Sequence, residues 1–122
     1  MQIKESAENY LETILVLSKK LGAVRSIDVA NEMGFTKASI SIAMKRLREN
    51  DYIVVSQDGN ISLTTAGKEI AKKVYERHQI IAKILISLGV NEKTAYEDSC
   101  RIEHDLSQES FEKIKEFYEK GI

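Results

Sequence analysis

The chain contains no proline and no tryptophan, and only one of its 122 residues is a cysteine. A single cysteine excludes an internal disulfide framework and fits the reducing cytosol. The absence of proline, together with abundant helix formers, predicts a mostly helical protein. Because no apolar run is long enough to span a bilayer and no signal peptide is evident, we expect a cytoplasmic protein without a membrane segment.

An excess of charge of one sign is also missing. The 18 Lys and Arg residues nearly balance the 19 Asp and Glu residues, which gives a formal net charge of -1. Any nucleic-acid contact must therefore come from a local basic cluster rather than from the whole chain. A chain of this length can bury a core without crosslinks, and it predicts one compact unit or a small domain with an appendage.

The segment Ser26–Asn50 carries the strongest fold signal. Ser26 is expected to be the N-cap of a short helix that Gly34 ends, and Phe35 is expected to anchor the core. Thr36 is a suitable cap for the longer helix that follows. A short helix, a glycine turn and a longer helix form the helix-turn-helix layout.

The longer helix, expected from Lys37 to about Glu49, carries short hydroxyl groups first and cations later. Hydroxyl groups near the start of such a helix approach base edges or phosphates, and the cations neutralise phosphates. A solvated helix face is the ordinary alternative, but a basic cluster on the recognition helix of a neutral chain favours DNA binding. The candidate DNA-binding residues here are Thr36, Lys37, Ser39, Ser41, Lys45, Arg46 and Arg48.

Two β-prone runs, Tyr52–Ser56 and Ile61–Leu63, flank Asp58-Gly59. This arrangement predicts a hairpin, and a hairpin directly after a recognition helix makes the unit a winged helix. Because the tip has no Lys or Arg, its candidate DNA contacts are Gln57 and Asn60, through side chains or backbone amides. A purely structural wing is the alternative.

Three helices are expected after the hairpin: a long connector from about Ala66 to Leu88, a helix from Glu92 to about Leu106, and a last helix capped by Ser107. The apolar faces beyond a complete winged helix need a partner, and a second copy of the chain is the simplest one. The sequence therefore predicts a mainly α protein. A winged helix-turn-helix DNA-binding domain, residues 1–65, precedes a helical dimerisation domain, residues 66–122.

Cys100, Glu103 and His104 lie at positions i, i+3 and i+4 of the expected helix and so share one face. A thiolate, a carboxylate and an imidazole together suit a transition-metal ion. From this segment alone, a buried cysteine beside a solvated Glu-His pair is the favoured interpretation, because one helix with three groups is not a complete site.

Three further polar residues have ordinary interpretations when they are taken alone. Asn9 and Glu12 lie three residues apart on the expected first helix, where polar pairs on an exposed face are common. His78, in the middle of the long helix, is more typical of a structural residue than of a ligand. An enzyme is the least favoured alternative, since Cys100 and His104 share a helix with no glycine-rich loop or oxyanion motif nearby.

Four stretches together resemble the metal-dependent repressors related to the diphtheria toxin repressor, and among them the manganese transport regulators. They are Glu8–Ile14, Ser26–Asn50, Leu63–Gly67 with Arg77-His78, and Cys100–Ser107. The resemblance covers nearly the whole chain in order. No length remains for the SH3-like third domain of the iron-responsive members, which again resembles the two-domain manganese branch.

The resemblance implies a homodimeric repressor, typically of metal-uptake genes, that binds a palindromic operator when a divalent transition metal is bound. In that family the effector site draws on the first helix, the long helix and the helix around residue 100, so residues 66–122 become a metal-binding and dimerisation domain. The ligand candidates carried over by position are Asn9, Glu12, His78, Cys100, Glu103 and His104. The resemblance thus implies that His78 is a metal ligand rather than a structural residue.

Two positions depart from the manganese branch. Asn9 stands where those regulators have aspartate and the iron-responsive members have methionine, and a neutral amide is a weaker ligand than a carboxylate. Cys100 stands where the manganese regulators have glutamate and the iron-responsive members have cysteine. A thiolate favours iron, cobalt, nickel or zinc over manganese. Ala82 replaces a glutamate of the second site of the iron-responsive members, so one site is expected.

The expected effector is therefore manganese or iron, with zinc, cobalt and nickel open. Two other functions remain as alternatives. One is a metal-independent winged-helix regulator whose metal site has decayed, which the amide of Asn9 keeps open. The other is a winged-helix module used for protein contacts.

Overall fold

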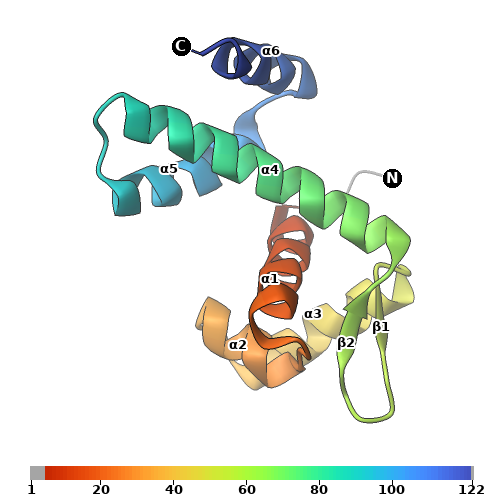
Figure 1. The fold of residues 1–122 in the computed structure, drawn as a ribbon. Coiled ribbons are helices and arrows are strands. Elements are labelled where there is room, and N and C mark those ends of the chain that lie inside the picture. The colour runs from red at the N-terminus through yellow and green to blue at the C-terminus, as the bar shows by residue number, and fades with distance from the viewer. Residues whose placement is uncertain (1–4, 122) are drawn as a thin grey trace. The chain divides into compact units, whose positions relative to one another are not determined.

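The computed structural model describes residues 5–121, and the chain forms two compact units, Met1–Lys73 and Val74–Ile122. The division falls inside a helix, whereas the domain boundary expected from the sequence, between residues 65 and 66, lies at the start of that helix and stays a prediction. In chain order (Figure 1) the elements are α1 (Glu5–Leu21), α2 (Ser26–Met33), α3 (Lys37–Glu49), β1 (Ile53–Val55), β2 (Ile61–Leu63), α4 (Thr65–Ser87), α5 (Glu92–Asp105) and α6 (Gln108–Glu119).

The first unit is a winged helix-turn-helix, as the sequence predicts. The strands β1 and β2 are antiparallel, with Ile53 opposite Leu63 and Val55 opposite Ile61. Val24, in the segment between α1 and α2, forms a further bridge to Ile61, whose N–H donates to the Val24 carbonyl oxygen at 2.7 Å. The wing is therefore tied to the helices by a third backbone segment.

Apolar residues at helical spacing build the core of this unit. Leu11, Ile14 and Ile40 are fully buried, and removing such side chains from water stabilises the fold by about 1.5–3 kcal/mol each. The other buried apolar residues of the unit are Leu15, Leu17, Val24, Val29, Ala30, Met44, Leu47, Ile53, Ile61 and Ala71.

Different groups cap α2 and α3. The expectation that Ser26 caps α2 is wrong, because Ser26 is the first helical residue and Arg25 occupies the N-cap position. The carboxylate of Asp28 accepts a hydrogen bond from the backbone N–H of Arg25 at 2.9 Å and so supplies the cap from inside the helix. Thr36 caps α3 as expected, since its hydroxyl oxygen accepts from the N–H of Ser39 at 3.1 Å.

The turn between α2 and α3 depends on Gly34, whose φ of 71° lies in the left-handed region that favours glycine. The expectation that Phe35 anchors the core is wrong, because its side chain is 49% exposed. The N–H of Phe35 donates to the carbonyl oxygen of Ala30, so the residue closes the end of α2 instead. Its ring packs edge-on against Tyr10, with the ring centroids 6.2 Å apart.

The wing is joined tightly to the first turn of α4. The hydroxyl of Thr64 donates to the Asp51 carbonyl oxygen at 2.7 Å and accepts from the N–H of Gly67 at 3.1 Å. A Cβ atom on Gly67 would lie 2.0 Å from the carbonyl oxygen of Tyr52. This contact explains a glycine in a helix, where it otherwise costs about 1 kcal/mol relative to alanine.

In the second unit, α5 and α6 pack against the C-terminal part of α4. Asn91 and Ser107 cap α5 and α6 as expected, through side-chain oxygens that accept from backbone N–H groups. The guanidinium of Arg77 donates to the carbonyl oxygen of Leu106 at 2.6 Å and lies 5.2 Å from the ring centroid of Phe111. Arg77 therefore holds the linker between α5 and α6 against α4.

A second polar contact joins α6 to α4. Nζ of Lys115 donates a hydrogen bond to Oε1 of Glu76 at 3.0 Å. This hydrogen bond and the negative charge of Glu76 raise the pKa of Lys115 above its ordinary value of 10.5. In the part of the chain that the structure describes, no helix is both long enough and apolar enough to cross a membrane.

Candidate metal centre and DNA-binding face

One face of α5 presents three candidate metal ligands. The side chains of Cys100, Glu103 and His104 point to the same side of the helix because they lie at i, i+3 and i+4. Their candidate ligand atoms all lie within 4.8 Å of one another. This spacing is short enough for one ion to reach all three groups.

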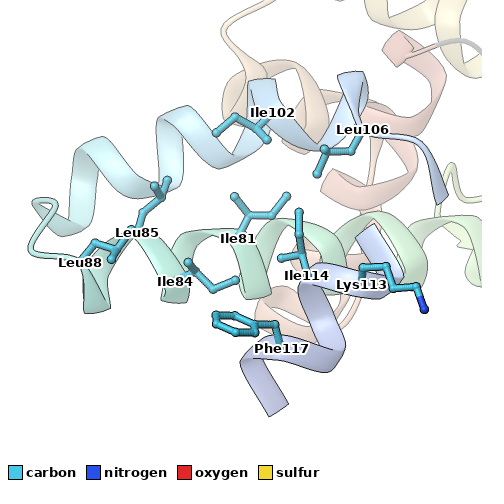
Figure 2. Close-up of a pocket in the computed structure, with 9 residues that line it drawn as sticks. All are labelled: Ile81, Ile84, Leu85, Leu88, Ile102, Leu106, Lys113, Ile114 and Phe117. Carbon is cyan, nitrogen blue, oxygen red and sulfur yellow. The ribbon is translucent and has the colours of Figure 1, made fainter. Parts of the chain in front are cut away.

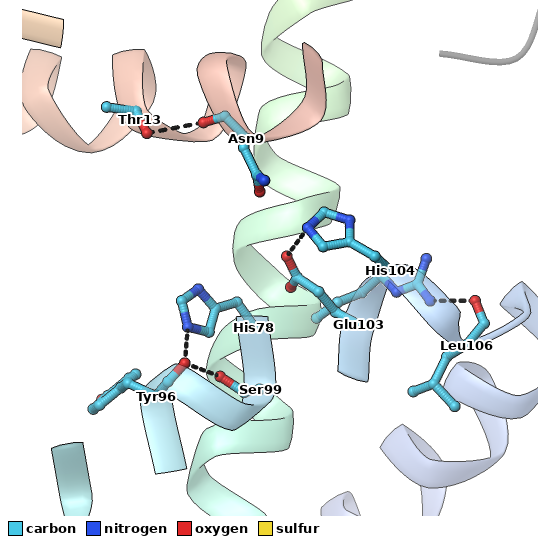
Figure 3. A network of polar contacts seen from close by, with 9 residues as sticks. Asn9, Thr13, His78, Tyr96, Ser99, Glu103, His104 and Leu106 are labelled. Carbon is cyan, nitrogen blue, oxygen red and sulfur yellow. Dashed lines mark hydrogen bonds and ion pairs between the residues drawn. The ribbon is translucent and has the colours of Figure 1, made fainter. Parts of the chain in front are cut away.

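Glu103 and His104 are the most buried members of this cluster. Their side chains are 2% and 5% exposed, and Nε2 of His104 lies 3.5 Å from Oε1 of Glu103 (Figure 3). A carboxylate at this depth favours a positive partner, because its charge is poorly solvated there. A protonated histidine supplies one positive charge, and a divalent cation supplies two.

His78 brings a fourth candidate ligand from α4. Its Nε2 atom lies 3.0 Å from the carbonyl oxygen of Tyr96, which also accepts from the hydroxyl of the fully buried Ser99 at 2.9 Å (Figure 3). Because a carbonyl oxygen can only accept, this contact requires a proton on Nε2, and in the neutral imidazole Nδ1 is then the basic nitrogen. The candidate ligand atoms of His78 and Glu103 also lie within 4.8 Å of each other.

Four of the six ligand candidates therefore lie in the second unit. A thiolate, two imidazoles and a carboxylate form a donor set that fits a divalent transition metal. The other two candidates lie on α1 in the first unit, where Glu12 is 9% exposed and Asn9 is half-buried. The hydrogen bond from the Thr13 hydroxyl goes to the backbone carbonyl of Asn9, not to its side-chain amide.

The outer face of α3 is basic and accessible. No acidic residue lies between Lys37 and Arg48. The hydroxyls of Thr36 and Ser39 are 3.0 Å apart and belong to the helix cap, so these two groups also shape the start of the helix. All seven candidate residues on or beside α3 are exposed: Thr36, Lys37, Ser39, Ser41, Lys45, Arg46 and Arg48.

The two candidates in the wing differ in their surroundings. Gln57 is exposed at the tip. Asn60 is half-buried and closes the hairpin, because its N–H donates to the hydroxyl oxygen of Ser56 and its carbonyl oxygen accepts from the N–H of Ser56 at 2.9 Å. Gln57 is therefore the more accessible of the two.

Sequence reasoning missed one prominent residue on this face. Ile42 is 56% exposed in the middle of α3. The buried positions Ile40, Met44 and Leu47 define the inner face of the helix. At about 100° per residue, Ile42 is turned roughly 200° from Ile40, so the same spacing that identifies the core could have placed Ile42 outside.

An apolar groove crosses the second unit (Figure 2). It has a volume of about 610 Å³, and its walls come from α4, α5 and α6. Two of its lining residues are far more exposed than such side chains usually are, with Leu88 at 75% and Phe117 at 63%. The lining residues are Ile81, Ile84, Leu85, Leu88, Ile102, Leu106, Lys113, Ile114 and Phe117.

Comparison with known proteins matches the two halves of the chain to two domains of one protein family. Residues 2–61 match the N-terminal DNA-binding domain of iron-dependent repressors, and residues 64–120 match the metal-binding and dimerisation domain of the same proteins. An uncharacterized HTH-type transcriptional regulator of Methanocaldococcus jannaschii is 33% identical over 120 residues, which cover 97% of this chain and 96% of the relative. The HTH-type transcriptional regulator MntR of Bacillus subtilis is 31% identical over 109 residues, covering 89% of this chain and 77% of the relative.

Solved structures agree with this fold. The manganese regulator SloR superposes with a TM-score of 0.81 and 23% sequence identity. The superposition covers 98% of this chain but only 55% of SloR, so the chain spans about half the length of that structure.

Proposed function

Because this chain belongs to the iron-dependent repressor family, we propose that it is a cytosolic transcriptional repressor that binds a palindromic operator as a homodimer when a divalent transition metal is bound. The chain is a metal-dependent transcriptional regulator and not an enzyme, as its family and its relatives show. The observation that carries the proposal is the close cluster of Cys100, Glu103 and His104 in the domain that matches a metal-binding model.

The metal site is proposed to use all six carried-over residues. His78, Cys100, Glu103 and His104 would hold the ion from the second unit, with Nδ1 of His78 as its ligand atom. Glu12 and the side-chain carbonyl of Asn9 would add oxygen ligands from α1. A bound divalent ion would supply the positive charge that offsets the negative charge of the anionic ligands, and the neutral donors would complete its coordination. Because the ligands lie on separate helices, the ion binds best to the conformation that brings them together. Metal binding would therefore raise the population of that conformation.

The donor set bears on which metal this chain senses. The regulators of known metal named among its relatives and similar structures include manganese-dependent repressors. Cys100 offers a soft thiolate, and Asn9 offers only a neutral amide oxygen, so iron, cobalt or zinc would bind this site well. We propose manganese or iron as the effector, with a stronger response to the softer ions than a site made only of carboxylates and imidazoles would give.

The apolar groove is proposed to be the contact between two copies of the chain. Leu88 and Phe117 are large apolar side chains left largely in water, and exposed apolar patches of this kind mark interaction sites. The groove lies within the stretch that matches a dimerisation domain. Leu88→Glu with Phe117→Glu should therefore yield monomers in analytical ultracentrifugation. Ile86→Glu is the matched control, because Ile86 is an exposed apolar residue of α4 that does not line the groove.

Two copies would place two α3 helices in successive major grooves, which requires a palindromic target. On each helix, Lys45 and Arg46 would neutralise phosphates, while the residues near the helix start approach base edges. Uptake genes for the sensed metal are the proposed targets, because a repressor active at high metal limits further uptake.

One titration tests the proposal. A duplex is selected from a random library with the chain and Mn(II), and its affinity is then measured by fluorescence anisotropy with Mn(II), Fe(II), Co(II), Zn(II) or a chelator, under anaerobic conditions. We expect the affinity to rise with at least one ion and the rise to be lost in His104→Ala. Equal affinity with every ion and with chelator would instead support a metal-independent regulator. Binding that is insensitive to Lys45→Ala and Arg46→Ala would support a protein-interaction module.

A further inference from the structure

We propose that Ile42 is a specificity residue that reads the 5-methyl group of a thymine in the major groove, with Ala38 beside it on the same helix face. The inference rests on the proposed function, since it requires α3 to lie in a DNA groove. It assigns base recognition to an apolar contact rather than to the cations of the helix.

Ile42 is not needed for the core of its own unit. Its side chain is 56% exposed, while Ile40, Met44 and Leu47 on the opposite face of α3 are at most 4% exposed. Helix α2 and strand β1 of the same unit pack against α3. The apolar surface of Ile42 is therefore available to a partner that reaches the outer face of α3.

The neighbours of Ile42 on the helix define what kind of partner fits. Ala38 and Ser39 lie one turn before it, and Lys45 and Arg46 lie one turn after it. All four are exposed. The result is a small apolar spot bordered by a hydroxyl on one side and by two cations on the other.

A single exposed isoleucine is ordinary on a protein surface. What distinguishes Ile42 is its position at the centre of a helix with four cations and no carboxylate from Lys37 to Arg48. Such a face complements a polyanion, and a DNA groove offers one apolar feature to an isoleucine. Thymine carries a methyl group on its major-groove edge, which apolar side chains contact.

The cationic and the apolar residues of α3 therefore have different roles in the proposed complex. Lys45 and Arg46 contact phosphates, which sets the position of the helix without reading sequence. Ile42 and Ala38 contact the base edge, where a methyl group is favourable and a bare pyrimidine edge is not. Removing one buried methyl group forfeits about 0.8 kcal/mol, which corresponds to about a fourfold loss of affinity.

The test combines substitutions in the protein and in the DNA. The full chain with Mn(II) selects a duplex from a random library, and each thymine of that duplex is then replaced by deoxyuridine, which removes only the 5-methyl group. We expect the wild-type chain to lose about fourfold in affinity at one or more thymines. Ile42→Ala should show a clearly smaller difference between the thymine and uracil duplexes at those positions, so the two changes are non-additive.

Two variants keep the result interpretable. Val54→Ala removes an apolar side chain of β1 that is 57% exposed, and it should keep the full thymine preference of the wild type. Ile42→Gln keeps the length and the helical tendency of the residue and should reduce the preference as Ile42→Ala does. Circular dichroism and thermal unfolding show that each variant is folded.

The outcomes separate the inference from the proposed function. If the selected duplex binds tightly and Lys45→Ala weakens it, but the uracil effect is absent or is equal in the wild type and Ile42→Ala, the thymine contact is overturned while DNA binding stands. If the library yields no duplex that the chain binds, the proposed function fails and the thymine contact fails with it.

Discussion

Nε2 of His78 points at the carbonyl oxygen of Tyr96 from 3.0 Å away, so this backbone group decides which nitrogen of the imidazole is basic. We expect His78→Ala to lower the affinity for Mn(II) by at least about tenfold, because a ligand held by such a contact is already oriented. Competition with a fluorescent chelator measures the change. Ser99→Ala removes the other donor to the same carbonyl and should keep an affinity close to that of the wild type.

Glu103 should show opposite effects on stability and on metal binding. Glu103→Gln keeps the shape of a side chain that is 2% exposed but removes its charge. We expect the melting temperature of the metal-free chain to stay the same or to rise, because a buried carboxylate carries a desolvation penalty. The rise in melting temperature on adding Mn(II) should be lost, and a variant that kept it would remove Glu103 from the ligand set.

Cys100 should leave a spectroscopic signature. With Co(II) bound, a thiolate ligand gives a sulfur-to-metal charge-transfer band, which we expect in the wild type and not in Cys100→Ser. Cys100→Glu should raise the affinity for Mn(II) relative to that for Zn(II) by about tenfold or more, because a carboxylate replaces a soft ligand. An unchanged ratio of the two affinities would argue that Cys100 does not touch the ion.

Gly67 is predicted to tolerate no side chain. In Gly67→Ala the added Cβ would meet the Tyr52 carbonyl oxygen at 2.0 Å, and this atom belongs to the backbone and cannot swing away. We expect the free energy of unfolding to fall by at least about 2 kcal/mol, despite the better helix propensity of alanine. Chemical denaturation measures the loss, and Ala66→Ser, at an exposed position in the same turn, should change stability by less than about 0.5 kcal/mol.

The contact between Lys115 and Glu76 should make the free energy of unfolding fall at alkaline pH. The contact with Glu76 raises the pKa of Lys115 above 10.5, so its contribution to stability is complete below that pH and is lost as the pH rises through the folded-state pKa. The difference in unfolding free energy between the wild type and Glu76→Gln should therefore shrink above about pH 10.5. A difference that stays constant into strong alkali would mean that the contact does not depend on the lysine charge.

Local chemistry explains which parts of the fold the sequence predicts. Thr36, Asn91 and Ser107 cap their helices as expected, because capping depends on one side chain and the two or three amides beside it. Ser26 fails as a cap because Asp28 supplies the oxygen from within the helix. Phe35 fails as a core residue because its amide completes the end of α2 and leaves its ring outside.

In the candidate metal centre, too, some residues can be predicted from local spacing and others cannot. Spacing along one helix places Cys100, Glu103 and His104 together without any knowledge of the fold. No pattern within α4 identifies His78, because its companions lie on α5 and meet it only through packing. His78 was therefore predicted as a ligand only from the resemblance to a family. The hydrogen bond to Tyr96 gives a physical reason for this role, because it orients the imidazole ring.

The hydroxyl of Thr64 has a consequence for the dynamics of the first unit. It donates to Asp51, whose φ of 62° is unusual for a residue with a side chain, and it accepts from Gly67 at the start of α4. Losing one of these hydrogen bonds loosens the group that makes the other. The hairpin and the first turn of α4 should thus open and close as one cooperative segment, with backbone amides that exchange with solvent at a common rate.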